Sequence, residues 1–320
     1  MQIFKPSLII IYGATGVGKT DFALELARQI PAEIINMDMG QFYTPLTIGT
    51  AKPDWRSYKT PHHLFDIIDK PENFSVTKYR ELVLNKVKEV WGRNKLAILI
   101  GGSGFYLKSL FFPPNAATFI PGSFEHLDND QLWHMLHEVD PLRAANIHVH
   151  DRYRLLRAVQ IWHSTGKKPS DHLLNFCPPR PFILINLMRD REQLYQRINQ
   201  RTNQMLDMGW VEEVEQLQNT LWVSFLQSKK IIGYDDILSY LAENKNQRDK
   251  ERLIETISQK TRNYAKRQMT FWRMLERQLE KALAAHDDLV IAKSELITFN
   301  LTLSDLDLYI NQLMQKLKQM

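Results

Sequence analysis

Short, almost unbroken apolar runs recur along this chain, and segments with apolar residues at helical spacing separate them. The runs that predict strands are Leu8–Tyr12, Ile34–Met37, Leu96–Ile100, Phe182–Leu187 and Leu296–Leu301. Between the second and third runs, Val76–Trp91 has the period of a helix, and Leu303–Leu317 predicts a closing helix. Because strands that alternate with helices form parallel sheets, we predict an α/β fold with a parallel sheet flanked by helices.

The pattern changes between the third and fourth predicted strands. Pro113-Pro114 interrupts it, and helical patterns follow at about Asn129–Val139 and His150–Ser164. The Pro178–Pro181 segment then returns the chain to the core, which is mostly helical from Leu187 to about residue 285. We therefore predict a helical insertion over residues 113–178, within a core made of residues 1–112 and 179–320.

A phosphate-binding motif, G-x-x-x-x-G-K-[ST], follows the first predicted strand and precedes a helical pattern. Its residues are Gly13, Ala14, Thr15, Gly16, Val17, Gly18, Lys19 and Thr20. Glycines let the backbone wrap around anionic oxygens, and the free N–H groups at the helix start point at the ligand. We expect Lys19 to reach the outer phosphate and Thr20 to hold Mg²⁺. This motif is typical of the P-loop NTPase type of fold, but it leaves open which phosphate compound binds.

Asp38 follows the second predicted strand and therefore lies at the carboxyl edge of the sheet, where ligands bind in open α/β folds. The residue is a candidate metal or water ligand, and the alternative is a structural acid that caps the next turn. The adjacent pair His62-His63 does not predict a metal site, because neighbouring residues on a strand point to opposite sides. We expect one of these histidines to be buried and hydrogen-bonded.

A basic stripe is predicted on a helix near the C-terminal side. Between Lys260 and Lys281 there are seven Lys or Arg residues against two acids. At about 100° per residue, one face collects Arg262, Lys266, Arg273 and Arg277, and aromatic and leucine side chains lie opposite. The stripe fits contact with RNA phosphates, although an isolated basic run is more often a solvated face.

Composition places the chain among ordinary globular proteins. It has 320 residues, of which 44% are hydrophobic and 24% charged. No apolar run approaches the roughly 18–20 residues that span a bilayer, and no signal peptide is evident. The single cysteine, Cys177, excludes an intramolecular disulfide and a Cys-rich zinc site. We expect a cytoplasmic protein, and a net charge of +5 permits a nucleic-acid partner.

The motifs together resemble the tRNA dimethylallyltransferases, also called tRNA isopentenyltransferases, from about Ile9 to Arg273. The matching residues, beyond the phosphate loop, are Asp38-x-x-Gln41-x-Tyr43, Ile48-Gly49-Thr50-Ala51-Lys52-Pro53, Pro61-His62-His63-Leu64-Phe65-Asp66, Gly101-Gly102-Ser103-Gly104-Phe105-Tyr106, Ile147-His148, Asp151, Arg154, Arg157-Ala158, Gly233-Tyr234, Tyr264-Ala265-Lys266-Arg267-Gln268, Thr270, Trp272 and Arg273. This order of motifs is hard to obtain otherwise.

The resemblance implies a reaction and a set of roles. The phosphate loop binds the diphosphate of dimethylallyl diphosphate, with Mg²⁺ on Thr20 and with Lys230 as a further diphosphate contact. An adenosine on the 3′ side of the tRNA anticodon attacks the allylic carbon, Asp38 is the base and Ser103 bonds to the adenine or the diphosphate. The implied tRNA contacts are Asp38, Met39, Gly40, Gln41, Ser103, Arg154, Arg157, Lys266, Arg267, Gln268 and Arg273. The insertion would clasp the anticodon stem–loop of a tRNA bound by a monomer.

Several positions depart from the family pattern. Met39 stands where Ser is usual, Lys230 replaces Arg, and Asp235-Asp236 replace a basic residue. The insertion is also shorter than usual between Leu110 and Asp140. We expect an active but divergent enzyme. The alternatives are a P-loop kinase or NTPase, a prenyltransferase for free adenine nucleotides, and an RNA-binding protein with a weakened catalytic core.

Overall fold

The computed structural model describes residues 8–114, 124–171, 175–179, 181–242, 247–285, 294–303 and 305–319. Arg180 of the predicted return linker lies outside these ranges, as do residues 115–123 and 172–174 of the predicted insertion. The chain divides into two compact units, each described by itself below. The core unit comprises residues 1–111 and 178–320, and the insertion unit comprises residues 112–177.

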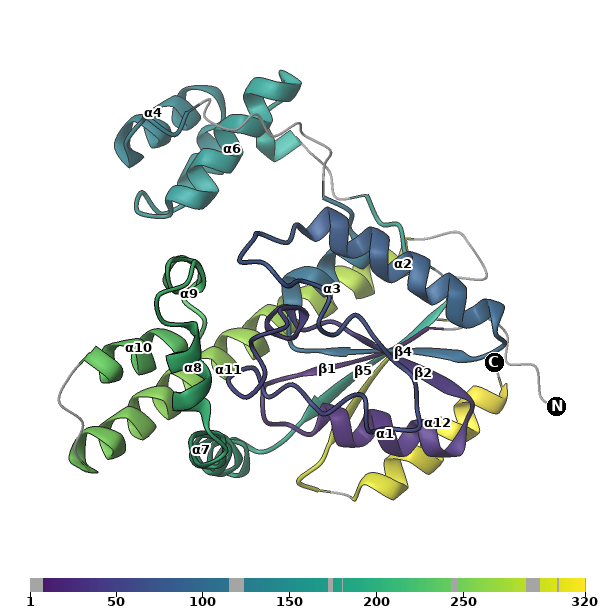
Figure 1. The fold of residues 1–320 in the computed structure, drawn as a ribbon. Coiled ribbons are helices and arrows are strands. Elements are labelled where there is room, and N and C mark those ends of the chain that lie inside the picture. Colours follow the sequence, from purple (N-terminus) through teal and green to yellow (C-terminus); the bar gives the residue numbers. More distant parts are fainter. Residues whose placement is uncertain are drawn as a thin grey trace. The chain divides into compact units, whose positions relative to one another are not determined.

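A six-stranded parallel sheet forms the centre of the core unit (Figure 1). Its strands, in the spatial order β3-β2-β4-β1-β5-β6, are β1 Leu8–Gly13, β2 Ala32–Asn36, β3 His62–His63, β4 Leu96–Gly101, β5 Phe182–Met188 and β6 Glu295–Asn300. The predicted α/β class and its parallel sheet are confirmed. Every residue of β1, β2 and β4 is buried, as expected for strands covered on both faces.

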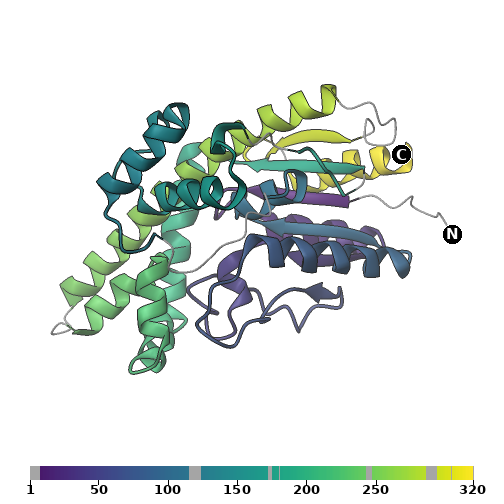
Figure 2. The ribbon, with the colours of Figure 1, turned by 90° about the horizontal axis from the view of Figure 1, so that it is seen from above.

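Helices cover both faces of this sheet. The helices of the core unit are α1 Lys19–Gln29, α2 Val76–Gly92, α3 Gly104–Phe111, α7 Arg191–Asp207, α8 Trp210–Leu217, α9 Trp222–Lys229, α10 Tyr234–Ala242, α11 Gln247–Ala284 and α12 Leu306–Gln319, with the short 3₁₀ helix η1 at Met39–Phe42. In Figure 1, α1 and α12 lie on one face, and α2, α3 and the near part of α11 lie on the other. Figure 2 shows α11 continuing past the sheet, and its far part packs against α7 and α10.

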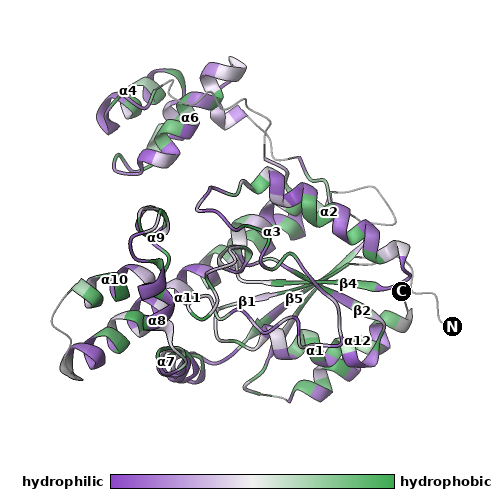
Figure 3. Ribbon diagram, viewed as in Figure 1, coloured by the Kyte–Doolittle hydropathy of each residue, from purple (hydrophilic) through white to green (hydrophobic). Residues whose placement is uncertain are grey.

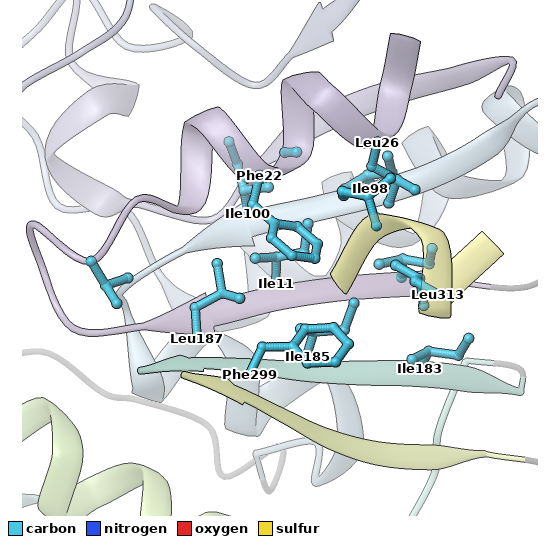
Figure 4. Close-up of a cluster of buried hydrophobic side chains, with 14 of the residues drawn as sticks. Ile11, Phe22, Leu26, Ile98, Ile100, Ile183, Ile185, Leu187, Phe299 and Leu313 are labelled. Carbon is cyan, nitrogen blue, oxygen red and sulfur yellow. The ribbon is translucent and has the colours of Figure 1, made fainter. Parts of the chain in front are cut away.

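A hydrophobic core lies between the sheet and the α1–α12 layer. Figure 4 shows side chains of the strands meeting those of these two helices. Phe22 and Leu26 of α1 and Leu313 of α12 are fully buried there against Ile11 and Ile185. Figure 3 shows hydrophobic residues concentrated in the central strands β4 and β5, whereas the helices carry residues of both kinds. This packing fixes the strand ends at which the candidate site is built.

The insertion unit is a separate small helical core. It contains α4 Asn129–Val139, α5 Pro141–Ala145, α6 Arg152–Thr165 and the 3₁₀ helix η2 Pro169–Asp171, around buried side chains that include Leu132 and Leu155. The predicted bounds of α4 are confirmed. The prediction that α6 begins at His150 is wrong by two residues, because the Asp151 side chain accepts a hydrogen bond from the Arg154 amide and caps the helix.

Other element ends also differ from prediction for local reasons. β2 stops at Asn36, because the Asn36 side chain bonds the backbone N–H and C=O of Asp38 and turns the chain away. The closing helix begins at Leu306 instead of Leu303, since the Asp305 carboxylate accepts the Leu308 amide and caps it. No helix among the described residues is both long and apolar enough to cross a membrane.

The histidine pair forms β3, a two-residue strand at the edge of the sheet. His62 is 7% exposed and its Nδ1 lies 2.7 Å from the Thr60 carbonyl, which confirms one buried, hydrogen-bonded histidine. His63 Nε2 lies 2.6 Å from the carboxylate of Glu33. Within the described ranges, no three His, Cys, Asp or Glu side chains are grouped so as to hold a metal ion.

Glu33→Gln is expected to destabilise the fold. Glu33 is 2% exposed and bonds Arg93, Lys95 and His63. Burial alone would raise the pKa of this carboxyl, but the bonds from Arg93, Lys95 and His63 outweigh it and lower the pKa to about 2. A lowered pKa means that this stabilisation is present above the ordinary carboxyl range and is lost as pH falls towards about 2. We expect roughly 1–2 kcal/mol less unfolding free energy at pH 7 in a urea titration, allowing for the solvent exposure of the cations.

The matched control for this experiment is Glu81→Gln, which removes an exposed carboxylate from α2. The stability difference between Glu33→Gln and the unaltered protein should shrink when the titration is repeated near pH 3. A Glu33→Gln protein as stable at pH 7 as the control would show that the cluster contributes nothing to folding.

Candidate functional site

The phosphate loop between β1 and α1 has the backbone shape that its glycines predict. Gly16 and Gly18 have positive φ angles of 81° and 110°, and Gly18 precedes the first residue of α1. At Gly13 a Cβ would lie 2.4 Å from the Leu187 carbonyl oxygen, so only glycine fits. The loop therefore presents the free N–H groups of a helix start to one side of the sheet edge.

Lys19 lies folded back over this loop. Its Nζ donates to the carbonyl oxygens of Gly13 and Ala14 at 3.0 Å each. Burial lowers the pKa of Lys19 to about 8, with the Asp38 carboxylate opposing the shift and Arg201 adding to it. The Lys19 ammonium is thus held inside the site, close to a carboxylate.

Asp38 lies two residues beyond the end of β2 and caps the 3₁₀ helix η1. Its Oδ1 accepts the Gly40 amide at 3.3 Å, and the Asn36 side chain holds its backbone. Burial raises the pKa of Asp38, while Lys19 and hydrogen bonds from backbone amides oppose the shift. A carboxylate with a raised pKa in a partly dry site is suited to accept a proton.

Ser103 lies beside Asp38 because β2 and β4 are neighbours in the sheet. The Met39 amide donates to Ser103 Oγ at 3.3 Å, which leaves the hydroxyl proton free to donate. The two loops are packed closely: a Cβ at Gly101 would lie 2.6 Å from the backbone of Met37. The sheet order therefore places Asp38 and Ser103 at the same edge.

A cavity of about 790 Å³ opens over this edge. The expected site residues that line it are Thr15, Gly16, Gly18, Lys19, Thr20, Asp38, Met39, Gly40, Gln41, Ser103, Lys230, Arg267 and Gln268. Gly13, Ala14 and Val17 are buried in the body of the loop. Lys266 and Arg273 lie on the exposed side of α11, and Arg154 and Arg157 lie in the insertion unit.

Two arginines of α7 complete the phosphate loop and were not predicted. Arg201 donates to the Thr15 hydroxyl at 2.7 Å, and Arg197 donates to the Gly16 carbonyl at 3.0 Å. Both residues line the cavity, and their i, i+4 spacing puts them on one face of the helix. That spacing is the only signal in the sequence, and it is also common on solvated helices.

Gln268, an expected tRNA contact, lines the cavity and also has a structural role. The residue is 6% exposed, and its amide is hydrogen-bonded within the chain. Its Oε1 accepts the Thr15 amide at 3.0 Å, and its Nε2 donates to the Gly102 carbonyl at 2.8 Å. Gln268 therefore ties the phosphate loop to the segment that precedes Ser103.

The basic stripe on α11 does not include Arg262. The Arg262 side chain is 12% exposed and donates to Asn199 and Glu255 at 2.6 Å each. The other predicted members, Lys266, Arg273 and Arg277, are exposed, and Lys281 extends the stripe by one turn. Arg273, Arg277 and Lys281 line a shallow groove along the helix, together with Thr270, Met274 and Gln278.

In the insertion unit, α6 presents the two expected arginines. Arg154 Nε lies 3.3 Å from the Asp151 carboxylate, and its side chain is 66% exposed. Arg157 follows one turn later and is partly buried. Exposure leaves the Arg154 guanidinium available to an anionic partner.

Similarity to known proteins identifies the family of this chain. The family model described as IPP transferase matches residues 41–275. The tRNA dimethylallyltransferase of Alkaliphilus oremlandii is 35% identical over 85% of this chain and 90% of that relative, and the Bacillus subtilis enzyme of the same name is 36% identical with the same coverage. The chain belongs to the IPP transferase family.

Solved structures extend the likeness of this family member to three dimensions. The tRNA isopentenylpyrophosphate transferase of Staphylococcus epidermidis is 27% identical, with a TM-score of 0.62 over 99% of this chain and all of that chain. A eukaryotic dimethylallyltransferase captured acting on tRNA has a TM-score of 0.74 at 26% identity, over 97% of this chain and 77% of that one. These matches support the P-loop-like fold class.

The positions that depart from the family pattern can now be placed in this IPP transferase. Met39 lines the cavity beside Ser103 and Asp38, so it adds apolar surface where a hydroxyl is usual. Lys230 ends α9 with a left-handed φ of 50°, is exposed and also lines the cavity. Asp236 pairs with Lys260 at 2.6 Å and ties α10 to α11, which gives this acid a structural use.

Proposed function

We propose that this IPP transferase family member transfers the dimethylallyl group of dimethylallyl diphosphate to tRNA. The acceptor is the exocyclic amine of the adenosine on the 3′ side of the anticodon. The new bond joins the amine nitrogen to the allylic carbon as the carbon–oxygen bond breaks, and diphosphate leaves with the bonding electron pair. The observation that carries the proposal is that Asp38 and Lys19 line one cavity. In this cavity Asp38 would be the proton acceptor, and Lys19 would be a cation for the leaving group.

Asp38 is proposed as the base that removes the amine proton. An exocyclic aromatic amine is a poor nucleophile, so its proton must leave as the bond forms. The raised pKa of Asp38 supports this role, since the carboxylate binds a proton more readily than an ordinary aspartate. Ser103 lies beside it with a free hydroxyl proton and can orient the adenine by donating to a ring nitrogen.

The diphosphate is proposed to bind at the phosphate loop. The loop amides, Lys19, Arg197 and Arg201 surround its opening and can stabilise charge that gathers on the leaving oxygens. Lys230 lines the same cavity from the end of α9 and adds a further cation. The site thus brings several positive groups and the proposed base together in one cavity.

A Mg²⁺ ion fits this site if it is shared with the diphosphate. Thr20 is partly buried at the start of α1, lines the cavity, and offers a hydroxyl oxygen of the hard type that Mg²⁺ prefers. Mg²⁺ commonly takes few protein ligands and completes its shell with phosphate oxygens and water. When bound, the ion would neutralise charge on the departing diphosphate.

The tRNA is proposed to approach along charged surfaces of both units. The adenosine must leave its stack to enter the cavity, where Met39, Gly40 and Gln41 line the wall beside Asp38. The stripe on α11 supplies cations for backbone phosphates, and Arg154 and Arg157 supply them on the insertion unit.

Lys230→Arg is expected to strengthen donor binding. Lys offers one point charge, whereas the guanidinium of Arg can bond a diphosphate with two parallel N–H groups. We expect the KM for dimethylallyl diphosphate to fall roughly threefold to tenfold in steady-state assays. Lys229→Arg is the matched control, since Lys229 lines the same cavity one residue earlier. An unchanged KM in Lys230→Arg would remove residue 230 from the diphosphate contacts.

The experiment that tests the function uses labelled dimethylallyl diphosphate, Mg²⁺ and unmodified tRNA whose anticodon loop contains adenosines. Label that enters the RNA supports the proposal. Label that enters free adenosine monophosphate and not RNA would identify a small-acceptor transferase, and steady ATP hydrolysis without transfer would identify a P-loop NTPase. Binding of tRNA without transfer would identify an RNA-binding relative with a weakened core. The family membership of the chain favours the first outcome.

A further inference from the structure

One carboxylate holds the turn that follows the proposed base-binding segment. Glu213 of α8 accepts the backbone amides of Thr47 and Ile48 at 3.0 and 2.6 Å on Oε2. On Oε1 it accepts the Gly49 amide at 3.2 Å and the Tyr234 hydroxyl at 2.7 Å. Three consecutive amides and a phenol therefore converge on one side chain that is far away in the sequence. The proposed mechanism gives this carboxylate no role.

Close packing leaves little freedom at this contact. At Gly49 a Cβ would lie 2.1 Å from the indole nitrogen of Trp210 and 2.6 Å from the ring of Tyr234. Gly233 is packed against the other end of the Trp210 ring, where a Cβ would lie 2.0 Å away. The turn is thus pressed against α8 and α10 at the point where Glu213 binds it.

The other side of the same turn holds the proposed acceptor-binding residues. Gln41 Nε2 donates to the carbonyl oxygens of Thr50 and Ala51 at 3.1 and 3.2 Å. A Cβ at Gly40 would lie 2.8 Å from the Thr50 side chain, so η1 rests directly on the turn. A displacement of the turn would therefore move the Gln41 amide and the backbone that Asp38 caps.

We propose that Glu213 is a positioning residue for the acceptor base, acting through the turn over residues 47–51. This inference rests on the proposed function. Without the carboxylate, three backbone N–H groups lose their acceptor, and the turn must find water or move. The phosphate loop makes none of the Glu213 contacts described above, so donor binding should not depend on it. Glu213 thus separates acceptor positioning from donor positioning.

The test compares Glu213→Ala and Glu213→Gln with Glu212→Gln. Glu212 is the exposed neighbour on α8 and serves as the matched control. In Glu213→Gln, one side-chain oxygen can still accept hydrogen bonds, but the amide nitrogen that replaces the second oxygen faces other donors. The effect of this variant should therefore be intermediate. Thermal unfolding of each variant checks that the protein folds. Hydrogen exchange of the Thr47, Ile48 and Gly49 amides reads the anchoring of the turn directly.

For Glu213→Ala, we expect faster exchange at these three amides and a KM for tRNA raised roughly tenfold, with the KM for dimethylallyl diphosphate within twofold of the unaltered protein. The control should match the unaltered protein in all three. Unchanged exchange, an unchanged KM for tRNA, or an equal rise in both KM values would overturn the role of Glu213. If the unaltered protein itself transferred no prenyl group to tRNA, the proposed function would fail and the acceptor role with it, and the exchange data would still report whether Glu213 anchors the turn.

Discussion

Asp38→Asn is expected to lower kcat for prenyl transfer by a factor of about 10²–10⁴, with the KM for dimethylallyl diphosphate nearly unchanged. The substitution keeps the shape of the side chain and removes its ability to accept the amine proton. The Asn Oδ1 can still accept the Gly40 amide that caps η1, so the local backbone should persist. The measurement is steady-state transfer of labelled dimethylallyl groups to unmodified tRNA, with Asp54→Asn, an exposed loop carboxylate, as the control.

The pH dependence of prenyl transfer by the unaltered protein is a second test of the role of Asp38. Asp38 must be ionised to act as a base, and burial raises its pKa. Activity should therefore rise with pH through the raised pKa of Asp38. As the pH is lowered, activity should be lost at a higher pH than an ordinary aspartate would give. The acid limb should be absent from the residual activity of Asp38→Asn. Retention of most of the activity by that variant, with the same acid limb, would remove Asp38 from the role of base.

Lys19→Met is expected to reduce kcat/KM for dimethylallyl diphosphate by roughly 10²–10³ and to raise Tm. The activity loss follows because the Lys19 ammonium, which bonds the Gly13 and Ala14 carbonyl oxygens, no longer meets the diphosphate. The gain in stability follows from the direction of the pKa shift. Because burial lowers the pKa of Lys19 to about 8, the protonated side chain is less stable in the folded protein than in the unfolded chain. Below pH 8 the folded state carries this penalty in full, and a methionine removes it.

The measurements are donor kinetics and a thermal unfolding scan at pH 7. The affinity of the unaltered protein for diphosphate should also decline as pH rises above about 8, because Lys19 of the ligand-free protein loses its proton there. The matched control is Lys229→Met, which removes a cation that lines the same cavity. A Lys19→Met protein that binds diphosphate as tightly as the unaltered one would contradict the assignment of Lys19 to the leaving group.

The parts of the fold that could be predicted from sequence are those set by local pattern. Apolar runs such as Leu96–Ile100 identify buried strands because a strand covered on both faces has no polar side. The phosphate loop is equally local, since its glycines, Lys19 and Thr20 lie within one strand–loop–helix unit. Asp38 and Ser103 could be placed at one edge because the carboxyl ends of parallel strands share that edge.

The remainder of the site depends on contacts between residues far apart in the sequence. Arg201 reaches Thr15 from α7, and Gln268 reaches the same residue from α11. No spacing rule in a single sequence identifies such pairs, and the same residue types occur on solvated helix faces. Arg262 failed as a member of the basic stripe for the same reason, since its acceptor Asn199 lies on α7. Glu213 belongs to this class, and only the folded chain brings it to the turn that it binds.

Mass analysis of the nucleosides of an unmodified tRNA, after incubation with the purified protein, Mg²⁺ and dimethylallyl diphosphate, decides whether this IPP transferase prenylates tRNA. We expect a single adenosine, the one on the 3′ side of the anticodon, to gain one dimethylallyl group on its exocyclic amine. The initial rate at which this product forms should fall by about 10²–10⁴ when Asp38→Asn replaces the unaltered protein. A tRNA that remains unmodified, or one prenylated equally well by Asp38→Asn, would contradict the proposed function.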